Sequence, residues 1–454
     1  MTTSIPIYRR IIALTLPLMF IQICQASLGL VDTLIAGQYH YKDLAAVGLA
    51  SNLWSPVAIL LTGIMYALVP KFSSAVGNNQ WEKVSELFRL GKRNALILSV
   101  IGFMLLQTLA FLMPIFIVDP EVAGIAKNYL HAVAFAIPGL TYIVLYRFLN
   151  EGHSNMKPIA ITGGLLLITN CGLNYILVGG FAGFPPLGGL GCGVATVIST
   201  YLALLCLKTL SAKTLHPLKP LMNDPIDAKS AQKLMLEGLP IGIALVLEVL
   251  ALTALAFMAS TLGTKVVAAH QVAINIAMVI FMIPVAISSA ATIQVAHFHG
   301  KQESNNSRKT ALAAMLIAAG YGSVMTLILL LFGHHLTGLF TQDQEVNNLI
   351  SGLIIFIAMF QLVDALQMVA AGILRGLEEF VKPLLTVLFI YWVVIIPASY
   401  LIGVKGWLVS EPRIETIWMM LTLGLTFAAV FLGLQSYRML NKSKEKIITQ
   451  DVYQ

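Results

Sequence analysis

Three carboxylates stand inside long stretches that otherwise carry almost no charge: Asp32, Glu248 and Asp364. The stretch from Ile11 to Val31 contains no acidic or basic residue. At 1.5 Å per residue, such a run is long enough to cross the hydrocarbon core as a helix. An acid near the centre of such a helix costs about 2.5–3.5 kcal/mol on insertion scales. Acids at this depth are therefore candidates for proton transfer or cation binding.

The depth of each acid follows from the helical rise. Counted from the nearest inner basic residue, Glu248 lies about 22 Å, Asp364 about 17 Å and Asp32 about 33 Å into the membrane. The sequence places no Lys or Arg at a similar depth to neutralise them. We expect a proton relay, a cation site, or both. The alternative is a protonated acid that is bonded to a neighbouring backbone or hydroxyl group.

Amide side chains supply further oxygen atoms near the first acid. Asn170 and Asn174 are four residues apart and share one helix face. Carboxylate and amide oxygens suit Na⁺, by analogy with other hard cations. Hydrogen bonding between helices explains the two amides equally well. Gln22 and Gln25 are further candidates for lining the same cavity.

Three prolines interrupt the apolar runs, at Pro17, Pro240 and Pro284. Proline removes a helical hydrogen bond and commonly marks a kink in a membrane helix. These residues are our hinge candidates.

The composition is that of a polytopic membrane protein. The chain has 454 residues, of which 58% are apolar and 11% charged, with a mean hydropathy of +0.84. Soluble domains carry about 25% charged residues. The four cysteines lie in apolar segments without metal-ligand spacing, so we interpret them as small buried hydrophobes.

Charge-free runs predict an all-α fold with twelve transmembrane helices. The predicted spans are 10–37, 44–72, 93–118, 122–149, 158–180, 190–211, 229–262, 266–298, 309–334, 346–375, 383–404 and 415–437. The amphipathic segment 81–93 is expected on the inner membrane surface. With both termini in the cytoplasm, 23 of the 28 Lys and Arg residues lie inside and 5 outside. This bias fits the positive-inside rule, so the net charge of +7 reflects topology and predicts no nucleic-acid partner.

The two halves of the chain repeat one pattern. A shift of 223 residues aligns Leu16-Pro17 with Leu239-Pro240, and a shift of 225 aligns Lys157-Pro158 with Lys382-Pro383. Each half has six spans, so both run in the same direction, and we expect a pseudo-two-fold axis along the membrane normal. The predicted parts are a six-helix lobe at 1–214, a cytoplasmic linker at 215–228 and a second six-helix lobe at 229–454, which ends in a short basic cytoplasmic tail. A central cleft between the lobes would suit alternating access.

Four stretches resemble the multidrug and toxic compound extrusion (MATE) family. They are VDTLIAG at 31–37, NEGHSNMKP at 150–158, GLPIGIALVLEV at 238–249 and QLVDALQMVAAGILRG at 361–376. The resemblance runs nearly end to end, and the acids in the last two stretches are similar to those of the NorM-like branch.

This resemblance implies a two-lobe antiporter that exports organic cations in exchange for Na⁺ or H⁺. Asp32 would be the first-lobe carboxylate, with Asn170 in its polar network. Glu248 and Asp364 would be the coupling pair and the implied Na⁺ site. Some NorM-like members have a tyrosine where this chain has Phe360, so that hydroxyl is absent here. The expected partners are small hydrophobic cationic drugs or dyes and the lipid bilayer. We expect no cofactor beyond the coupling ion, and a monomer in the bacterial inner membrane.

Other classes remain as alternatives. A flippase for lipid-linked precursors would be expected to line its cleft with cationic residues, which the second-half spans lack. An intramembrane lipid-modifying enzyme would need a nucleophile or metal site at depth, and the sequence shows none. A channel would leak without exchange, and the repeat suits alternating access better.

Overall fold

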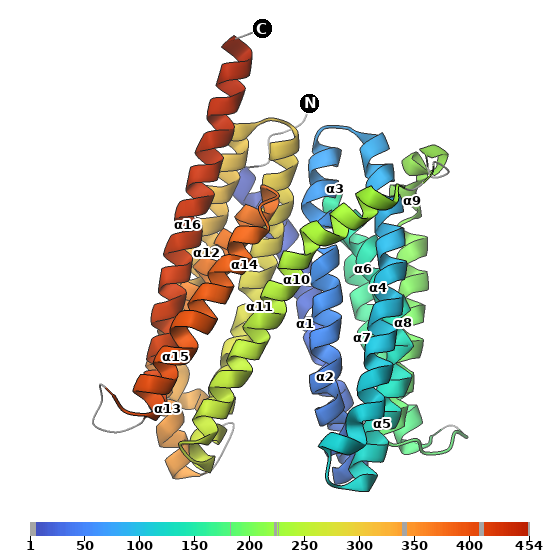
Figure 1. Ribbon diagram of the computed structural model, residues 1–454, viewed down its shortest axis with the longest axis vertical. Coiled ribbons are helices and arrows are strands. Elements are labelled where there is room, and N and C mark those ends of the chain that lie inside the picture. The colour runs from blue at the N-terminus through green and yellow to red at the C-terminus, as the bar shows by residue number, and fades with distance from the viewer. Residues whose placement is uncertain are drawn as a thin grey trace. The chain divides into compact units, whose positions relative to one another are not determined.

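The computed structural model describes residues 6–181, 183–221, 225, 227–337, 343–407 and 413–452, and every regular element in these ranges is a helix (Figure 1). The helices are α1 (Ile7–Tyr39), α2 (Tyr41–Met65), α3 (Leu68–Gly77), α4 (Trp81–Phe116), α5 (Pro120–Ala134), α6 (Ala136–Gly152), α7 (Lys157–Gly179), α8 (Gly189–Leu210), α9 (Ala212–Leu215), a 3-10 helix (His216–Leu221), α10 (Ala228–Ser260), α11 (Thr264–Gly300), α12 (Ser304–Thr337), α13 (Gln344–Gly376), α14 (Val381–Val387), α15 (Ile396–Ala398) and α16 (Ile414–Val452).

The membrane-spanning character predicted from the sequence is confirmed. In the described ranges, eleven helices are long and apolar enough to cross a membrane, counting α2 with α3 as one. The pair α5 and α6 makes a twelfth if the two are one span, bent by 42° at their junction. This pair occupies the predicted span 122–149.

The predicted span 44–72 is confirmed as α2 followed by α3, which together form one candidate span, Tyr41–Gly77, with a turn at Tyr66 and Ala67. One local prediction was wrong. The amphipathic segment 81–93 is not a separate surface helix, because it forms the first turns of the continuous helix α4. Most of its apolar side chains, among them Val84, Leu87 and Phe88, are almost fully buried in the protein, and Trp81 at its start is exposed. The pattern therefore reflects packing against other helices.

A turn rich in glycine and proline joins α7 to α8. Helix α7 ends at Gly179, and Gly180 has a φ of 75°. A Cβ at Gly180 would lie 2.6 Å from the backbone nitrogen of Pro186. Glycine is needed here for both reasons, since L-residues rarely adopt this φ. The chain then enters α8 at Gly189.

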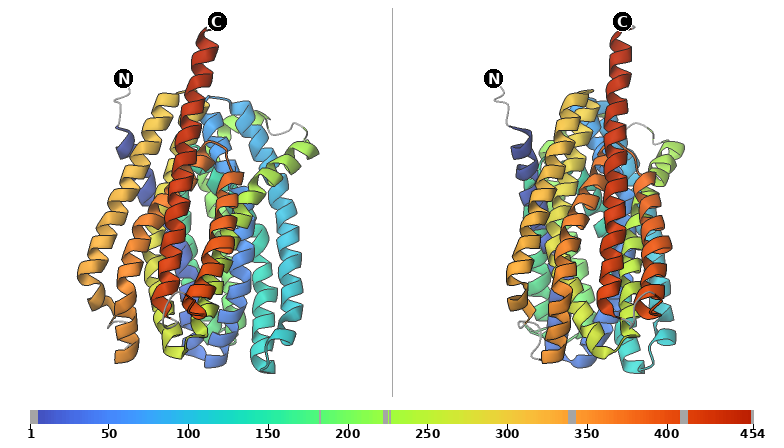
Figure 2. Two further views of the ribbon diagram at one scale, coloured as in Figure 1. Left: turned by 60° about the vertical axis from the view of Figure 1, so that its left-hand side comes forward. Right: turned by 90° about the vertical axis from the view of Figure 1, so that its left-hand side faces the viewer.

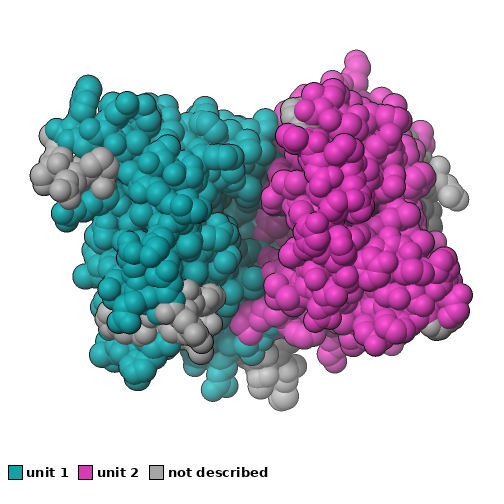
Figure 3. All heavy atoms as spheres, turned by 90° about the horizontal axis from the view of Figure 1, so that it is seen from below, with its two compact units in different colours: residues 1–16, 243–454 teal, residues 17–242 magenta. Residues whose placement is uncertain are grey.

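The chain forms two compact units, coloured separately in Figure 3. Unit 1 takes in the chain up to Leu16 and from Ile243 onwards, and unit 2 takes in Pro17–Gly242. The divisions fall inside α1 and α10, next to Pro17 and two residues beyond Pro240. Within unit 1, the end of α16 projects beyond the other helices (Figure 2).

Matching ion clusters in the two units support the predicted repeat. In unit 2, Lys42 lies 3.7 Å from Asp119 and also pairs with a glutamate two residues further on. In unit 1, Lys265 lies 3.3 Å from Asp343 and pairs in the same way. Both aspartates cap the helix that follows, each accepting a backbone N–H at 2.9 Å. These backbone hydrogen bonds lower the pKa of Asp119 and of Asp343. Corresponding residues are 223 or 224 positions apart, which is the shift found in the sequence.

Candidate functional site: buried carboxylates in each unit

Asp32 belongs to a closed ring of polar side chains in unit 2. Asn174 Nδ2 donates to Asp32 Oδ1 at 2.6 Å and to Asn170 Oδ1 at 3.0 Å. Asn170 Nδ2 donates to Thr196 Oγ1 at 3.3 Å, and Thr196 Oγ1 donates in turn to Asp32 Oδ2 at 3.5 Å. Asp32 is only 5% exposed, and the two asparagines are buried almost completely. Three helices, α1, α7 and α8, therefore meet through one carboxylate.

The ring confirms hydrogen bonding between helices, which is one of the two interpretations of the asparagines, and their role as cation ligands stays a prediction. Their spacing of one helical turn on α7 lets them bond to each other while one of them reaches Asp32. The amide oxygen of Asn174 remains buried, with no hydrogen-bond partner in the described part of the chain. Thr196 was not singled out from the sequence. A threonine in an apolar helix gives no signal of its own, since its hydroxyl often bonds the preceding turn.

The two glutamines predicted near Asp32 behave differently from the asparagines. Gln25 accepts a hydrogen bond from Arg147 Nη1 at 3.2 Å and takes no part in the ring. Gln22 is half-buried and makes no side-chain hydrogen bond with a described residue.

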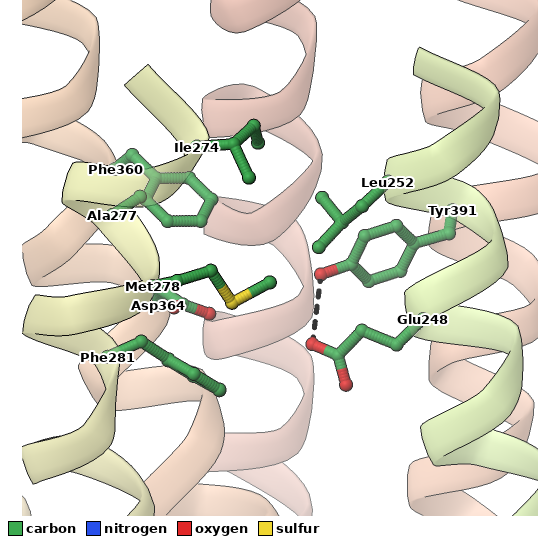
Figure 4. Close-up of a pocket in the computed structure, with 9 residues that line it drawn as sticks. All are labelled: Glu248, Leu252, Ile274, Ala277, Met278, Phe281, Phe360, Asp364 and Tyr391. Carbon is green, nitrogen blue, oxygen red and sulfur yellow. Dashed lines mark hydrogen bonds between the residues drawn. The ribbon is translucent and has the colours of Figure 1, made fainter. Parts of the chain in front are cut away.

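Unit 1 holds the other two acids on one cavity with about 360 Å³ of empty volume (Figure 4). Glu248 comes from α10 and Asp364 from α13. Tyr391 donates from its hydroxyl to Glu248 Oε1 at 3.2 Å. Asp364 is 3% exposed and has no hydrogen-bond partner among the described residues. The remaining lining is apolar, namely Leu252, Ile274, Ala277, Met278, Phe281 and Phe360.

Tyr391 is placed by an irregular helix. A π-helix runs from Leu388 to Ile395, directly after α14, and a second one runs from Ser399 to Val404. π-turns in α-helices occur frequently at functional sites. Here, Trp392 Nε1 also donates to the α10 backbone, at Leu247 O and 3.2 Å. Two consecutive aromatic residues therefore hold α10 at Glu248 and the residue before it.

Phe360 lines the same cavity, as its place in the sequence predicts. Its ring packs edge-on against that of Trp418, with the ring centroids 5.8 Å apart. The hydroxyl that Phe360 lacks is supplied to this cavity from Tyr391, on a different helix. Sequence reasoning missed Tyr391, because a tyrosine in an apolar run does not reveal which helix it faces.

The two sites have different chemical capacities. Carboxylate, hydroxyl and amide oxygens are the ligands that hard cations prefer. Two carboxyl groups on a cavity with apolar walls attract a cation strongly, because apolar walls screen charge less than water does. Asp32 already receives two donors, whereas Asp364 receives none from the described residues. The described residues include no group of three or more His, Cys, Asp or Glu side chains that could hold a metal ion.

The three predicted hinge prolines all lie inside helices, in α1, α10 and α11. Pro17 and Pro240 are close to the divisions between the units. Their role as hinges stays a prediction.

Comparison with known proteins shows which family the chain belongs to. The chain is 31% identical over 450 residues to the "Probable multidrug resistance protein NorM" of Mannheimia succiniciproducens, covering 97% of this chain and 96% of that protein. It is 32% identical over 440 residues to the "Multidrug resistance protein NorM" of Vibrio cholerae, covering 96% of each.

Solved structures show the same fold. One titled "Outward-facing conformation of a multidrug resistance MATE family transporter of the MOP superfamily" matches with a TM-score of 0.86, 18% identity and coverage of 96% of this chain and 97% of that chain. The Vibrio cholerae MATE transporter VcmN in the bent form matches with a TM-score of 0.85, 17% identity and coverage of 96% of this chain and 98% of that chain.

The MatE family model matches residues 17–176 and 240–401. The two matched stretches are offset by 223 residues at their starts and by 225 at their ends, as the repeat predicts. Together they cover more than half of the sequence, and the chain therefore belongs to the MATE family of membrane transporters.

Proposed function

We propose that this protein is a secondary active multidrug efflux transporter that exchanges small hydrophobic organic cations for Na⁺ or H⁺ by alternating access. Family membership and the names of the relatives support a multidrug transporter. The observation that carries the ion-coupled part is the unit 1 cavity, where Asp364 is buried without a hydrogen-bond partner among the described residues and faces the same space as Glu248. A buried carboxylate left unpaired is costly, so this arrangement is suited to a proton or cation that binds and leaves.

The roles of the two sites follow from their surroundings. Asp32, which is held by amide donors, is the site at which drug and proton compete. Glu248, Asp364 and the Tyr391 hydroxyl form the alternative cation site. Binding of an ion at one site and of a drug at the other is linked, because each changes the affinity of the protein for the other. The protein would act as a monomer in the bacterial inner membrane with both termini in the cytoplasm.

The test is efflux of ethidium and of norfloxacin from liposomes that contain the purified protein, first under a sodium gradient and then under a proton gradient. Exchange driven by one gradient identifies the coupling ion. A steady leak of ions without drug exchange would point to a channel and contradict the proposal.

The decisive variant is Asp364→Asn, which keeps the size of the side chain and removes its charge. Efflux is expected to fall to the rate of protein-free liposomes, while the amount of protein in the membrane stays unchanged. Asp119→Asn is the matched control, because it makes the same change at an exposed helix cap. Undiminished efflux from Asp364→Asn would refute the coupling mechanism.

A further inference from the structure

A second cavity lies inside unit 2, among α1, α6, α7 and α8, with about 370 Å³ of empty volume. Apolar side chains from all four helices form most of its wall, including Ile21, Ile143 and Leu207. Gln25 and Arg147 bring polar groups to it. An apolar pocket with a few convergent polar groups is the usual form of a small-molecule site.

Arg147 is the charged group of this cavity, and it is only 7% exposed. Its Nε donates to Glu151 Oε1 at 2.6 Å, and its Nη1 donates to Gln25 Oε1 at 3.2 Å. Its Nη2 donates to no residue that the structure describes. A guanidinium has five N–H donors, and the Nη2 of Arg147 is accessible rather than buried. Arg147 can therefore bind an additional acceptor group.

The geometry of the guanidinium favours a carboxylate as that acceptor. Arginine presents a planar fork that matches the two oxygens of a carboxylate. Glu151, which is fully buried, already balances the charge of Arg147. The pocket is therefore not expected to bind a free anion. A carboxylate is expected to bind there when another part of the same molecule is bound elsewhere.

The second attachment point is Asp32, on the same face of α1. Gln25 and Asp32 are seven residues apart, which is two helical turns or about 10 Å. The neighbouring helix repeats this arrangement: Thr162 and Leu166 line the cavity, and Asn170 and Asn174, on the same face of α7, belong to the Asp32 ring. Unit 2 thus carries the Asp32 carboxylate on α1 and, about two turns away along α1, the guanidinium that α6 brings to Gln25.

We propose that the Arg147 pocket is a subsite for the carboxylate of amphoteric substrates, which have an amine at one end and an acid at the other. Asp32 takes the amine, and Arg147 takes the acid together with the apolar ring that carries it. This inference rests on the proposed efflux function and assigns to Arg147 a role in choosing among substrates.

The experiment compares three compounds in the same liposome efflux assay: norfloxacin, its methyl ester and ethidium. Norfloxacin carries an amine and a carboxylate, the ester lacks only the carboxylate charge, and ethidium is a cation without an acid. The variant is Arg147→Lys, which keeps the positive charge opposite Glu151 and loses the planar fork. We expect the KM for norfloxacin to rise about tenfold, as for the loss of one charge-assisted hydrogen bond. The KM values for the ester and ethidium should stay unchanged, because neither compound presents a carboxylate to Arg147.

The double variant Arg147→Gln/Glu151→Gln is the second test, because it removes both charges together and leaves neither group buried and unpaired. It should show the same loss for norfloxacin alone. Arg93→Lys, outside the cavity, is the control for an arginine-to-lysine change. Equal losses for norfloxacin and its ester, or no loss for either, would overturn the subsite. Ethidium efflux by these variants reports separately on the proposed function.

Discussion

Replacing Gly238 with alanine tests how the first turns of α10 pack within unit 2. A Cβ at Gly238 would lie 1.7 Å from the backbone oxygen of Ile64 in α2, half of the 3.4 Å at which ordinary contacts begin. One turn further on, a Cβ at Gly242 would lie 2.7 Å from Leu60 O. Small residues four positions apart let two membrane helices approach closely. In both cases the obstacle is backbone, so no rotamer change can relieve the clash.

The loss of stability caused by Gly238→Ala depends on which groups must move. Adding methylene-sized groups to a packed interior costs about 1–3 kcal/mol. Separating α10 from α2 would also strain two nearby contacts at 2.9 Å, the Lys71–Glu237 ion pair and the hydrogen bond from Asn94 to Ala231 O. We therefore expect Gly238→Ala to destabilise the protein by about 3 kcal/mol, the upper end of that range.

The assay is thermal unfolding of the purified protein in detergent, together with ethidium efflux from liposomes. Gly48→Ala in α2 is the matched control, because a Cβ there has no atom within 4 Å. In a helix interior, this control change is expected to stabilise the protein by about 0.5–1 kcal/mol. Gly238→Ala should melt well below both the wild type and the control. If the two variants melt alike, α10 does not pack on α2 as the structure shows.

Two further substitutions test the hydrogen bonds of the buried acids. Asn174→Leu removes the closest donor to Asp32 and should lower the free energy of unfolding by about 1.5–3 kcal/mol. Asn170→Leu should lower it less, because Asn170 is linked to Asp32 only through Asn174 and Thr196. Thermal unfolding of the two variants tests this order. Tyr391→Phe removes the hydrogen bond to Glu248 and should change the ion concentration for half-maximal exchange in liposomes by about tenfold. An unchanged concentration would exclude this hydroxyl from the ion site.

The sequence predicted the spans well, because membrane insertion imposes length and hydropathy on each helix. It predicted the repeat for the same reason, since the two halves satisfy one set of constraints. The amphipathic start of α4 was misread, because an apolar face has the same period whether it packs on lipid headgroups or on protein. Distinguishing a lipid contact from a protein contact requires knowing what lies opposite Val84 and Phe88, and the periodicity of the sequence does not give this information.

The acids were found from the sequence because charge is rare at membrane depth, whereas their partners were found only in part. Asn170 and Asn174 stood out as amides one turn apart. Tyr391 did not, because its contact with Glu248 joins residues 143 positions apart and depends on a π-turn that no residue pattern announces. Arg147 was placed among the inner topology charges, yet it is buried beside a cavity.

The contrast between the two sites favours a different role for each. Asp32 is bonded to Asn174 and Thr196 without any ligand, so it can remain empty at little cost in free energy. Asp364 has no such bond among the described residues, so the state without a bound ion or proton is the costly one. A carboxylate that must be filled is suited to the driving ion, because ion binding there releases the most free energy for coupling. The two units thus share a fold but differ in the donors around their acids, and under the proposed function this difference would decide which site binds the ion and which binds the drug.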